Sequence, residues 1–154
     1  TGFDSANEDM PIEIPQKFEM GTLNIAGIAG LHASLDWILN QTIDALWEKE
    51  QNHRKTLLSI LESFDFIKLV GVRNDLPYVG IVSCLIDGLP SDTAANVFAE
   101  RSIAVRSGLQ CAPLTHKTLG TFPSGTIRFS CGTLTTQSDF DELKAVMELL
   151  KEEI

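Results

Sequence analysis

The sequence predicts an α+β fold, an α/β sandwich in which helices cover a small sheet. Two observations predict it. Apolar residues recur at every third or fourth position through residues 28–64 and again through residues 140–150, which is the spacing of amphipathic helices. Short runs rich in Val, Ile and Phe lie between these segments and have the composition of strands. Strands interspersed with helices in this order are typical of a sheet with helices packed against it.

The start of the chain is expected to be extended and irregular. Pro11 and Pro15 interrupt any helix there, and Gly21 marks a turn. The helical spacing begins directly afterwards. We therefore expect an extended N-terminal segment, residues 1–24, followed by a small domain, residues 25–154.

A long helical region opens this domain. Neither Pro nor Gly occurs between Leu31 and Val70, a stretch longer than most helices of globular proteins. We expect a break near residues 40–42. Thr42 can cap a second helix there, and Asp44 would interact favourably with the dipole of its first turn.

The strands and the remaining helices follow. Four short apolar runs are predicted to be strands: residues 66–70, 78–86, 103–106 and 126–130. Residues 91–101 form a predicted helix between the second and third of these runs. Glycines and prolines make residues 108–125 a loop, with one helical turn near residues 114–119. Thr136 or Ser138 is expected to cap a final helix.

Composition and charge exclude several classes of protein. The chain has 154 residues, of which 44% are hydrophobic and 21% charged, as in a globular domain that needs no metal or disulfide to stabilise it. Its net charge of −9 repels phosphate backbones, so we expect no nucleic acid partner. The longest apolar run, residues 78–86, is too short to span a membrane, and no leader of the secretory type opens the chain. Because the chain begins at Thr1 rather than Met, we expect it to be a fragment of a longer protein.

The cysteines and histidines do not have the spacing of metal ligands. The three cysteines are widely spaced without a CxxC pair, and the three histidines do not cluster. His32 and His53 are expected to be structural or solvated. The cysteine pattern favours a reduced, intracellular protein, and we expect it to be cytoplasmic.

Two of the cysteines are expected to be buried. Cys84 lies inside an apolar run, and strand alternation places Cys131 on the same face as Ile127 and Phe129. The opposite face of that strand carries Arg128. Its side chain is either a solvated residue of the sheet or a clamp for an anion, since a guanidinium group matches a carboxylate.

Cys111 has a different setting. Gly108 and Pro113 bracket it in a loop, and loops carry functional residues more often than cores do. The thiol is either inert or a nucleophile whose thiolate Arg106 favours. His116 follows closely, and a Cys–His pair is an alternative that the spacing does not decide.

A second candidate for a functional site precedes the long helical region. Residues 18–24 combine a glycine, a hydroxyl and an amide just before a helix. Such a segment can bind an anion through backbone N–H groups, or it can simply cap the helix through Thr22 or Asn24.

These segments resemble a known family. The residues FEMGTLN at positions 18–24 resemble the FEAGTPN segment of the class V aminotransferase group. The residues RSGLQCA at positions 106–112 resemble the RSGxxCA motif of cysteine desulfurases and selenocysteine lyases. Residues 126–130 with the helix start at Thr135–Thr136 resemble the closing strand and helix of the family, and Thr1–Gly2 resembles the end of its GGGTG segment.

The resemblance implies an enzyme that uses pyridoxal phosphate. It identifies the chain as the C-terminal small domain of a fold type I enzyme, with a small, mainly antiparallel sheet. No lysine stands in the context of the lysine that holds the cofactor, so that lysine and the large domain lie outside this chain. The fragment by itself is therefore expected to be inactive, whereas the parent is expected to be a homodimer.

The resemblance also implies roles for individual residues. Cys111 would take sulfur from L-cysteine, or selenium from L-selenocysteine, as a persulfide and leave L-alanine. Arg128 would clamp the substrate carboxylate, and Arg106 would shape the loop or the substrate pocket. Thr22 would reach the cofactor phosphate of the partner subunit, and a sulfur-acceptor protein is a possible partner. We expect no metal and no membrane partner.

This chain departs from the family pattern at two positions, and alternatives to the desulfurase reading remain. Leu23 replaces the usual Pro, and Gln110 stands where a His often precedes the cysteine. One alternative is a class V aminotransferase or lyase that does not use Cys111. The other is an α/β ligand-binding module without catalysis.

Overall fold

The computed structural model describes residues 6, 8–19, 21–73 and 76–153. Its contacts divide the chain into two compact units, residues 1–43 and 44–154. This division by contacts lies at residues 43 and 44, later than the expected boundary at residues 24 and 25. The expected boundary between an extended segment and a small domain stays a prediction. The motif positions Thr1, Gly2 and Met20 lie outside the described residues.

The first unit contains helix α1, Ile25–Gln41. Asn24 caps it, because the Asn24 side chain accepts a hydrogen bond of 2.9 Å from the backbone N–H of Gly27. The helix ends at Thr42, whose φ of 65° takes the chain out of the helical conformation. The break between helices therefore occurs where the sequence predicted it.

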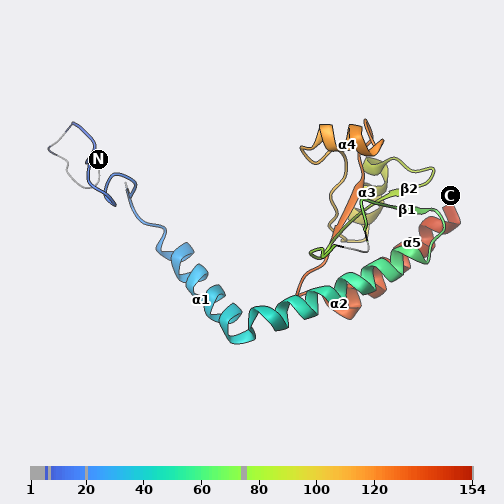
Figure 1. Cartoon of the computed structure of the whole chain (residues 1–154), viewed down its shortest axis with the longest axis horizontal. Coiled ribbons are helices and arrows are strands. Elements are labelled where there is room, and N and C mark those ends of the chain that lie inside the picture. Colours follow the sequence, from blue (N-terminus) through green and yellow to red (C-terminus); the bar gives the residue numbers. More distant parts are fainter. Residues whose placement is uncertain (1–5, 7, 20, 74–75, 154) are drawn as a thin grey trace. The chain divides into compact units, whose positions relative to one another are not determined.

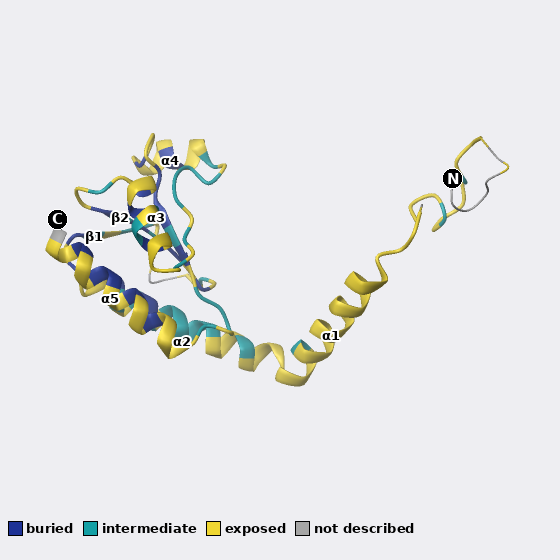
Figure 2. Cartoon of the chain, turned by 180° about the vertical axis from the view of Figure 1, so that it is seen from behind, coloured by how far each residue is buried: buried dark blue, intermediate teal, exposed yellow. Residues whose placement is uncertain are grey.

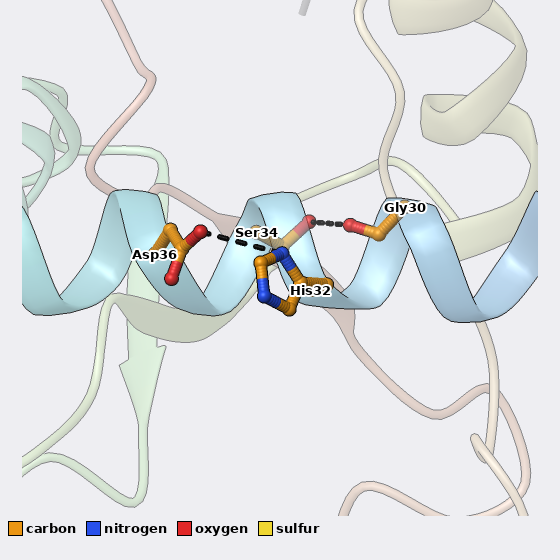
Figure 3. Close-up of polar contacts among 4 residues, drawn as sticks. All are labelled: Gly30, His32, Ser34 and Asp36. Atoms are coloured by element: carbon orange, nitrogen blue, oxygen red, sulfur yellow. Dashed lines mark hydrogen bonds and ion pairs between the residues drawn. The ribbon is translucent and has the colours of Figure 1, made fainter.

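Figure 3 shows the exposed polar side of α1. Ser34 Oγ donates to the carbonyl of Gly30 at 2.9 Å. His32 Nδ1 lies 3.3 Å from the carboxylate of Asp36, one turn further on, and both side chains are exposed. His32 is thus a solvated residue, as expected.

The second unit places helices α2, Ile43–Glu62, and α5, Gln137–Glu153, side by side along one face of the sheet (Figures 1 and 2). Asp44 lies in the first turn of α2, as predicted. Both helices turn an apolar stripe toward the sheet. The buried residues of these stripes are Leu57 and Leu61 of α2 and Phe140, Leu143, Val146, Met147 and Leu150 of α5.

The sheet has three antiparallel strands in the order β1, Ile67–Val70, then β2, Ile81–Ile86, then β3, Ile127–Ser130. Cys84 pairs with Ile127 on one side and with Leu69 on the other. Directly opposite residues share a face, so these three side chains lie on the core face. The expected fold, a small antiparallel sheet packed with helices, is confirmed.

The other face of the sheet is less covered and more polar. Ser83 and Arg128 are paired across β2 and β3, and both are half-buried, whereas Ile127 and Phe129 next to Arg128 are buried. Arg128 therefore points away from the core, as strand alternation predicted.

Helix α3, Ser91–Glu100, packs against β2 and β3. The strand predicted for residues 103–106 does not form, apart from an isolated bridge at Arg106. The reason lies at the end of α3. Ser102 has a φ of 58°, and the N–H of Ile103 donates to the carbonyl of Phe98 at 2.9 Å, so Ile103 belongs to the end of α3 and the chain meets β3 only at Arg106. Helix α4, Pro113–Leu119, confirms the helical turn predicted in the following loop.

The start of α5 has one of the two hydrogen bonds of a capping box, and Thr136 directly precedes the helix. The backbone N–H and the hydroxyl of Thr136 both donate to the carboxylate of Asp139, at 2.7 and 2.8 Å. These two bonds lower the pKa of Asp139 below its ordinary value. Thr136, rather than Ser138, therefore occupies the capping position. Within the described part of the chain, no helix has both the length and the apolar character needed to cross a membrane.

Candidate functional site

The loop that carries Cys111 begins at a two-residue bridge to the sheet. The N–H of Arg106 donates to the carbonyl of Arg128 at 3.1 Å, and the N–H of Arg128 donates back to the carbonyl of Arg106 at 2.7 Å. Such a reciprocal pair places two residues directly opposite each other, with side chains on the same face. Two arginines that are 22 positions apart in the sequence therefore share the polar face of the sheet.

Two glycines bring the loop against the segment before β3. Gly108 and Gly125 have φ values of 81° and 72°, which glycine adopts without steric cost. A Cβ atom at Gly125 would overlap the backbone of Gly108, so these two segments of the backbone approach as closely as glycine permits. The N–H of Thr126 donates to the carbonyl of Gly108 at 3.2 Å. The loop is thus fixed at a second point.

Ser91 is a third tether and lies at the start of α3. Its side chain is buried, and Oγ donates to the carbonyl of Ser124 at 2.6 Å while it accepts the N–H of Gly108 at 3.3 Å. The sequence assigned Ser91 only to a helix start. Its bonds reach 17 and 33 residues along the chain, so no local pattern signals them.

Cys111 stands at the tip of the tethered loop. Gln110 and Cys111 have φ values of 50° and 64°, and the N–H of Ala112 donates to the carbonyl of Leu109 at 2.8 Å. These four residues form a tight turn with two left-handed central residues. The Cys111 side chain is exposed, and α4 begins at Pro113. An exposed thiol on a turn anchored to the sheet is accessible to a small molecule or to a second protein.

The segment of the sequence that carries this loop is rich in positive charge. Residues 101–138 contain four Lys or Arg and no Asp or Glu, although the whole chain carries a net charge of −9. The Nε atom of half-buried Arg128 is inaccessible to solvent and has no hydrogen-bond partner among the described residues. Because like charges directly opposite in a sheet repel, Arg106 and Arg128 together suit an anion placed between them.

The other two cysteines differ from Cys111. Cys84 is fully buried as predicted, and burial raises the pKa of its thiol to about 12. Cys131, however, is only half-buried, because β3 ends at Ser130 and Cys131 packs at the margin of the core. Partial burial raises the pKa of Cys131 as well. Cys111 is therefore the exposed thiol of the chain.

His116 does not complete a Cys–His pair. It is buried in α4, where its Nδ1 lies 2.7 Å from the hydroxyl of Thr121 and its carbonyl accepts the N–H of Thr121 at 2.9 Å. His53 is also structural, since its Nδ1 lies 2.7 Å from the carbonyl of Gly132. The structure thus gives both histidines packing and hydrogen-bonding roles.

The segment before α1 contains the exposed hydroxyl of Thr22. Gly21 makes a turn with a φ of 85°, and Asn24 rather than Thr22 caps the helix. Thr22 is exposed and makes no hydrogen bond within the described residues. Its hydroxyl is therefore available to a ligand, whereas the capping alternative belongs to Asn24.

A family assignment follows from comparison with known proteins. The family model for aminotransferase class-V matches residues 4–143, which is most of the chain. The chain therefore belongs to the aminotransferase class-V family. Its described fold fits a part of a cysteine desulfurase-like protein.

The particular relatives are cysteine desulfurases. The sequence is 33% identical to a probable cysteine desulfurase of Pseudomonas putida over 141 residues, 89% of this chain and 34% of that protein. The structure resembles the apo structure of a cysteine desulfurase from Thermococcus onnurineus, with a TM-score of 0.75 and 31% identity, over 96% of this chain and 38% of the other.

A third structure shares only the fold. It is a mutant of the cystine C–S lyase C-DES with glycine covalently linked to its pyridoxal phosphate cofactor, and it has a TM-score of 0.65 at 20% identity over 84% of this chain and 30% of that one. The chain spans about a third of the length of the curated relatives it matches.

Proposed function

We propose that this chain is the cysteine-bearing part of a pyridoxal phosphate-dependent cysteine desulfurase that converts L-cysteine to L-alanine. One observation carries the proposal. The exposed thiol of Cys111 lies on a turn whose base is bridged to Arg128, so a nucleophile and a carboxylate-binding group belong to one tethered unit. The family membership of the chain supports the same reaction.

The residues present fit a substrate that is bound to pyridoxal phosphate. The half-buried guanidinium group of Arg128 and the exposed hydroxyl of Thr22 are groups that would bind a carboxylate and a phosphate, respectively. Thr22 would hold the phosphate of a cofactor bound to the partner subunit, and the lysine that carries the cofactor would lie outside this chain. When bound, pyridoxal phosphate supplies an electron sink for carbanion chemistry.

Cys111 is the nucleophile in this proposal. Its thiolate attacks the sulfur of the substrate cysteine and forms a new S–S bond. The substrate C–S bond breaks, and the carbon that loses the sulfur takes up a proton to give alanine. The sulfur remains on Cys111 as a persulfide, and no external oxidant is needed. A selenium atom in L-selenocysteine would follow the same course.

Arg128 and Arg106 orient the substrate. A guanidinium group forms two parallel hydrogen bonds with a carboxylate, which fixes the direction of the amino acid as well as its position. Because the Arg106 and Arg128 backbones are bonded to each other, the carboxylate site and the Cys111 loop keep a constant relation. Orientation of this kind directs the substrate sulfur toward Cys111.

We also propose an oligomeric state and a cellular location for the parent enzyme. The parent enzyme acts in the cytoplasm as a homodimer, in which Thr22 of each subunit serves the cofactor of the other. The exposed position of Cys111 suits delivery of the persulfide sulfur to an acceptor protein.

The decisive test substitutes Cys111 in the complete enzyme. Cys111→Ala should retain binding of the cofactor and of cysteine but lose alanine formation, because only the nucleophile is absent. Alanine production and the spectral titration of the cofactor with cysteine are measured on the same preparation. Full alanine production by Cys111→Ala would refute the desulfurase reading and favour a class V aminotransferase or lyase that does not use this thiol.

The second variant tests the carboxylate clamp. Arg128→Ala removes charge-assisted hydrogen bonds worth roughly 1.5–3 kcal/mol each, so cysteine should bind about tenfold more weakly or worse. Arg128→Lys should restore part of the affinity, since an ammonium group lacks the paired donors. Arg101→Ala, which removes an exposed arginine just after α3, is the matched control. Equal cysteine titrations for Arg128→Ala and the control would mean that Arg128 is only a solvated residue of the sheet.

A further inference from the structure

The turn at Cys111 has an uncommon backbone for its residues. Both central residues, Gln110 and Cys111, have positive φ values, 50° and 64°, and the N–H of Ala112 closes the turn on the carbonyl of Leu109. Positive φ at both central positions is the mark of type I′ turns, which favour Asn-Gly and similar pairs. Side chains with a Cβ atom disfavour this conformation. Some other contact must therefore hold the turn.

The side chain of Gln110 provides that contact. Its Nε2 donates to the carbonyl of Arg106 at 3.3 Å, and it also lies 3.4 Å from the carbonyl and 3.5 Å from the hydroxyl of Thr126. One amide group thus connects the tip of the loop with both sides of its base. Thr126 directly precedes β3, and Arg106 is the residue bridged to Arg128.

We propose that Gln110 is a positioning residue that holds the Cys111 thiol at a constant place relative to Arg128. The kinetic part of this inference rests on the proposed role of Cys111 as sulfur carrier. Without the Gln110 amide, the Cβ of residue 110 drives the turn toward right-handed conformations. The direction of Cys111 then changes, although Arg128 and its bridge remain intact.

Three substitutions separate the hydrogen bonds from the backbone preference. Gln110→Ala removes the donor but keeps a Cβ, so the turn should open. Gln110→Glu keeps the size and shape of the side chain but cannot donate to a carbonyl. Gln110→Gly also lacks the donor, yet glycine adopts positive φ freely and should restore part of the turn. Gln137→Ala removes the same side chain from an exposed position at the start of α5 and is the matched control.

The first measurement needs no enzyme activity. In the 154-residue chain, hydrogen exchange of the Ala112 amide reports opening of the turn, because this N–H is bonded to the carbonyl of Leu109. Loss of one neutral hydrogen bond corresponds to about fivefold faster exchange in Gln110→Ala and Gln110→Glu. Gln110→Gly should exchange more slowly than Gln110→Ala, and Gln137→Ala should match the wild type.

The second measurement uses the complete enzyme. Gln110→Ala should lower kcat for alanine formation about fivefold while KM for cysteine stays within about twofold, since the arginine clamp is unchanged. Gln110→Gly should recover part of kcat. Unchanged Ala112 exchange in Gln110→Ala and Gln110→Glu would overturn the inference, and so would altered exchange with an unaltered kcat. Failure of the desulfurase proposal itself is recognised separately, by alanine formation in Cys111→Ala.

Discussion

The close approach of Gly125 to Gly108 makes a strong prediction about the Cys111 loop. Gly125→Ala places a Cβ atom in the space occupied by the Gly108 backbone, at a position where φ is 72°. Gly120→Ala is its matched control. Gly120 has a φ of 71° at the end of α4, and an added Cβ there meets no atom within 4 Å. The two variants share the backbone penalty and differ in the overlap.

The magnitudes follow from these two contributions. A residue other than glycine costs about 1–2 kcal/mol when it adopts the left-handed conformation. The free energy of unfolding of both variants should therefore fall by this amount. Gly125→Ala must also move Gly108, and this movement breaks the 3.2 Å hydrogen bond from the N–H of Thr126 to the Gly108 carbonyl. Loss of that bond adds about 0.5–1.5 kcal/mol, before any strain in the buried neighbours is counted. We expect Gly125→Ala to be destabilised by about 1 kcal/mol more than Gly120→Ala.

The assay is urea denaturation of both variants, followed by far-ultraviolet circular dichroism. A second readout is the alkylation rate of Cys111, which should change in Gly125→Ala because Gly108 belongs to the same loop. It should not change in Gly120→Ala. Equal losses of stability in the two variants, together with equal alkylation rates, would show that Gly108 and Gly125 are not in contact and would refute the described loop.

Two further predictions concern thiols and acid stability. Brief alkylation of the native chain near neutral pH should label Cys111 first, Cys131 slowly and Cys84 last, because burial raises the pKa of the latter two thiols. Mass spectrometry of the peptides gives the order of labelling. Rapid labelling of Cys84 would contradict its place in the core. Asp139→Asn should destabilise the protein near neutral pH, because the pKa of Asp139 is lowered from 3.8 by the two hydrogen bonds from Thr136. A carboxyl group whose pKa is lowered by folding stabilises the protein above its unfolded pKa and loses this effect as the pH falls through the folded pKa, so the two urea midpoints should converge only below pH 3.8; a constant difference across this range would contradict the capping role.

Local pattern was sufficient for most elements of the second unit. The spacing of apolar residues predicted α2 and α5, and a break near Thr42 could be predicted because an uninterrupted helix there would be longer than most helices of globular proteins. Strand alternation correctly put Arg128 on the face opposite the core. These features depend on neighbours in the sequence, whose relation to one another is set by the backbone period.

Two predictions went wrong at the ends of elements. Residues 103–106 have a strand-like composition, but the turn at Ser102 bonds Ile103 back to α3. Cys131 alternates correctly with Phe129, yet β3 ends one residue before it and leaves it half-buried. Composition does not show where a strand loses its partner, since the partner is chosen by tertiary packing.

The sequence by itself determined the family and the fold class, and it singled out the candidate site residues Cys111, Arg106, Arg128 and Thr22. Motifs and loop chemistry are local, so they are legible without a structure. Only the tertiary structure decided that Arg106 lies directly opposite Arg128 and that Gln110 reaches Thr126 across 16 positions. Such pairings exist because the sheet and the glycine contact bring distant backbone segments together, and no periodicity in the sequence encodes that approach.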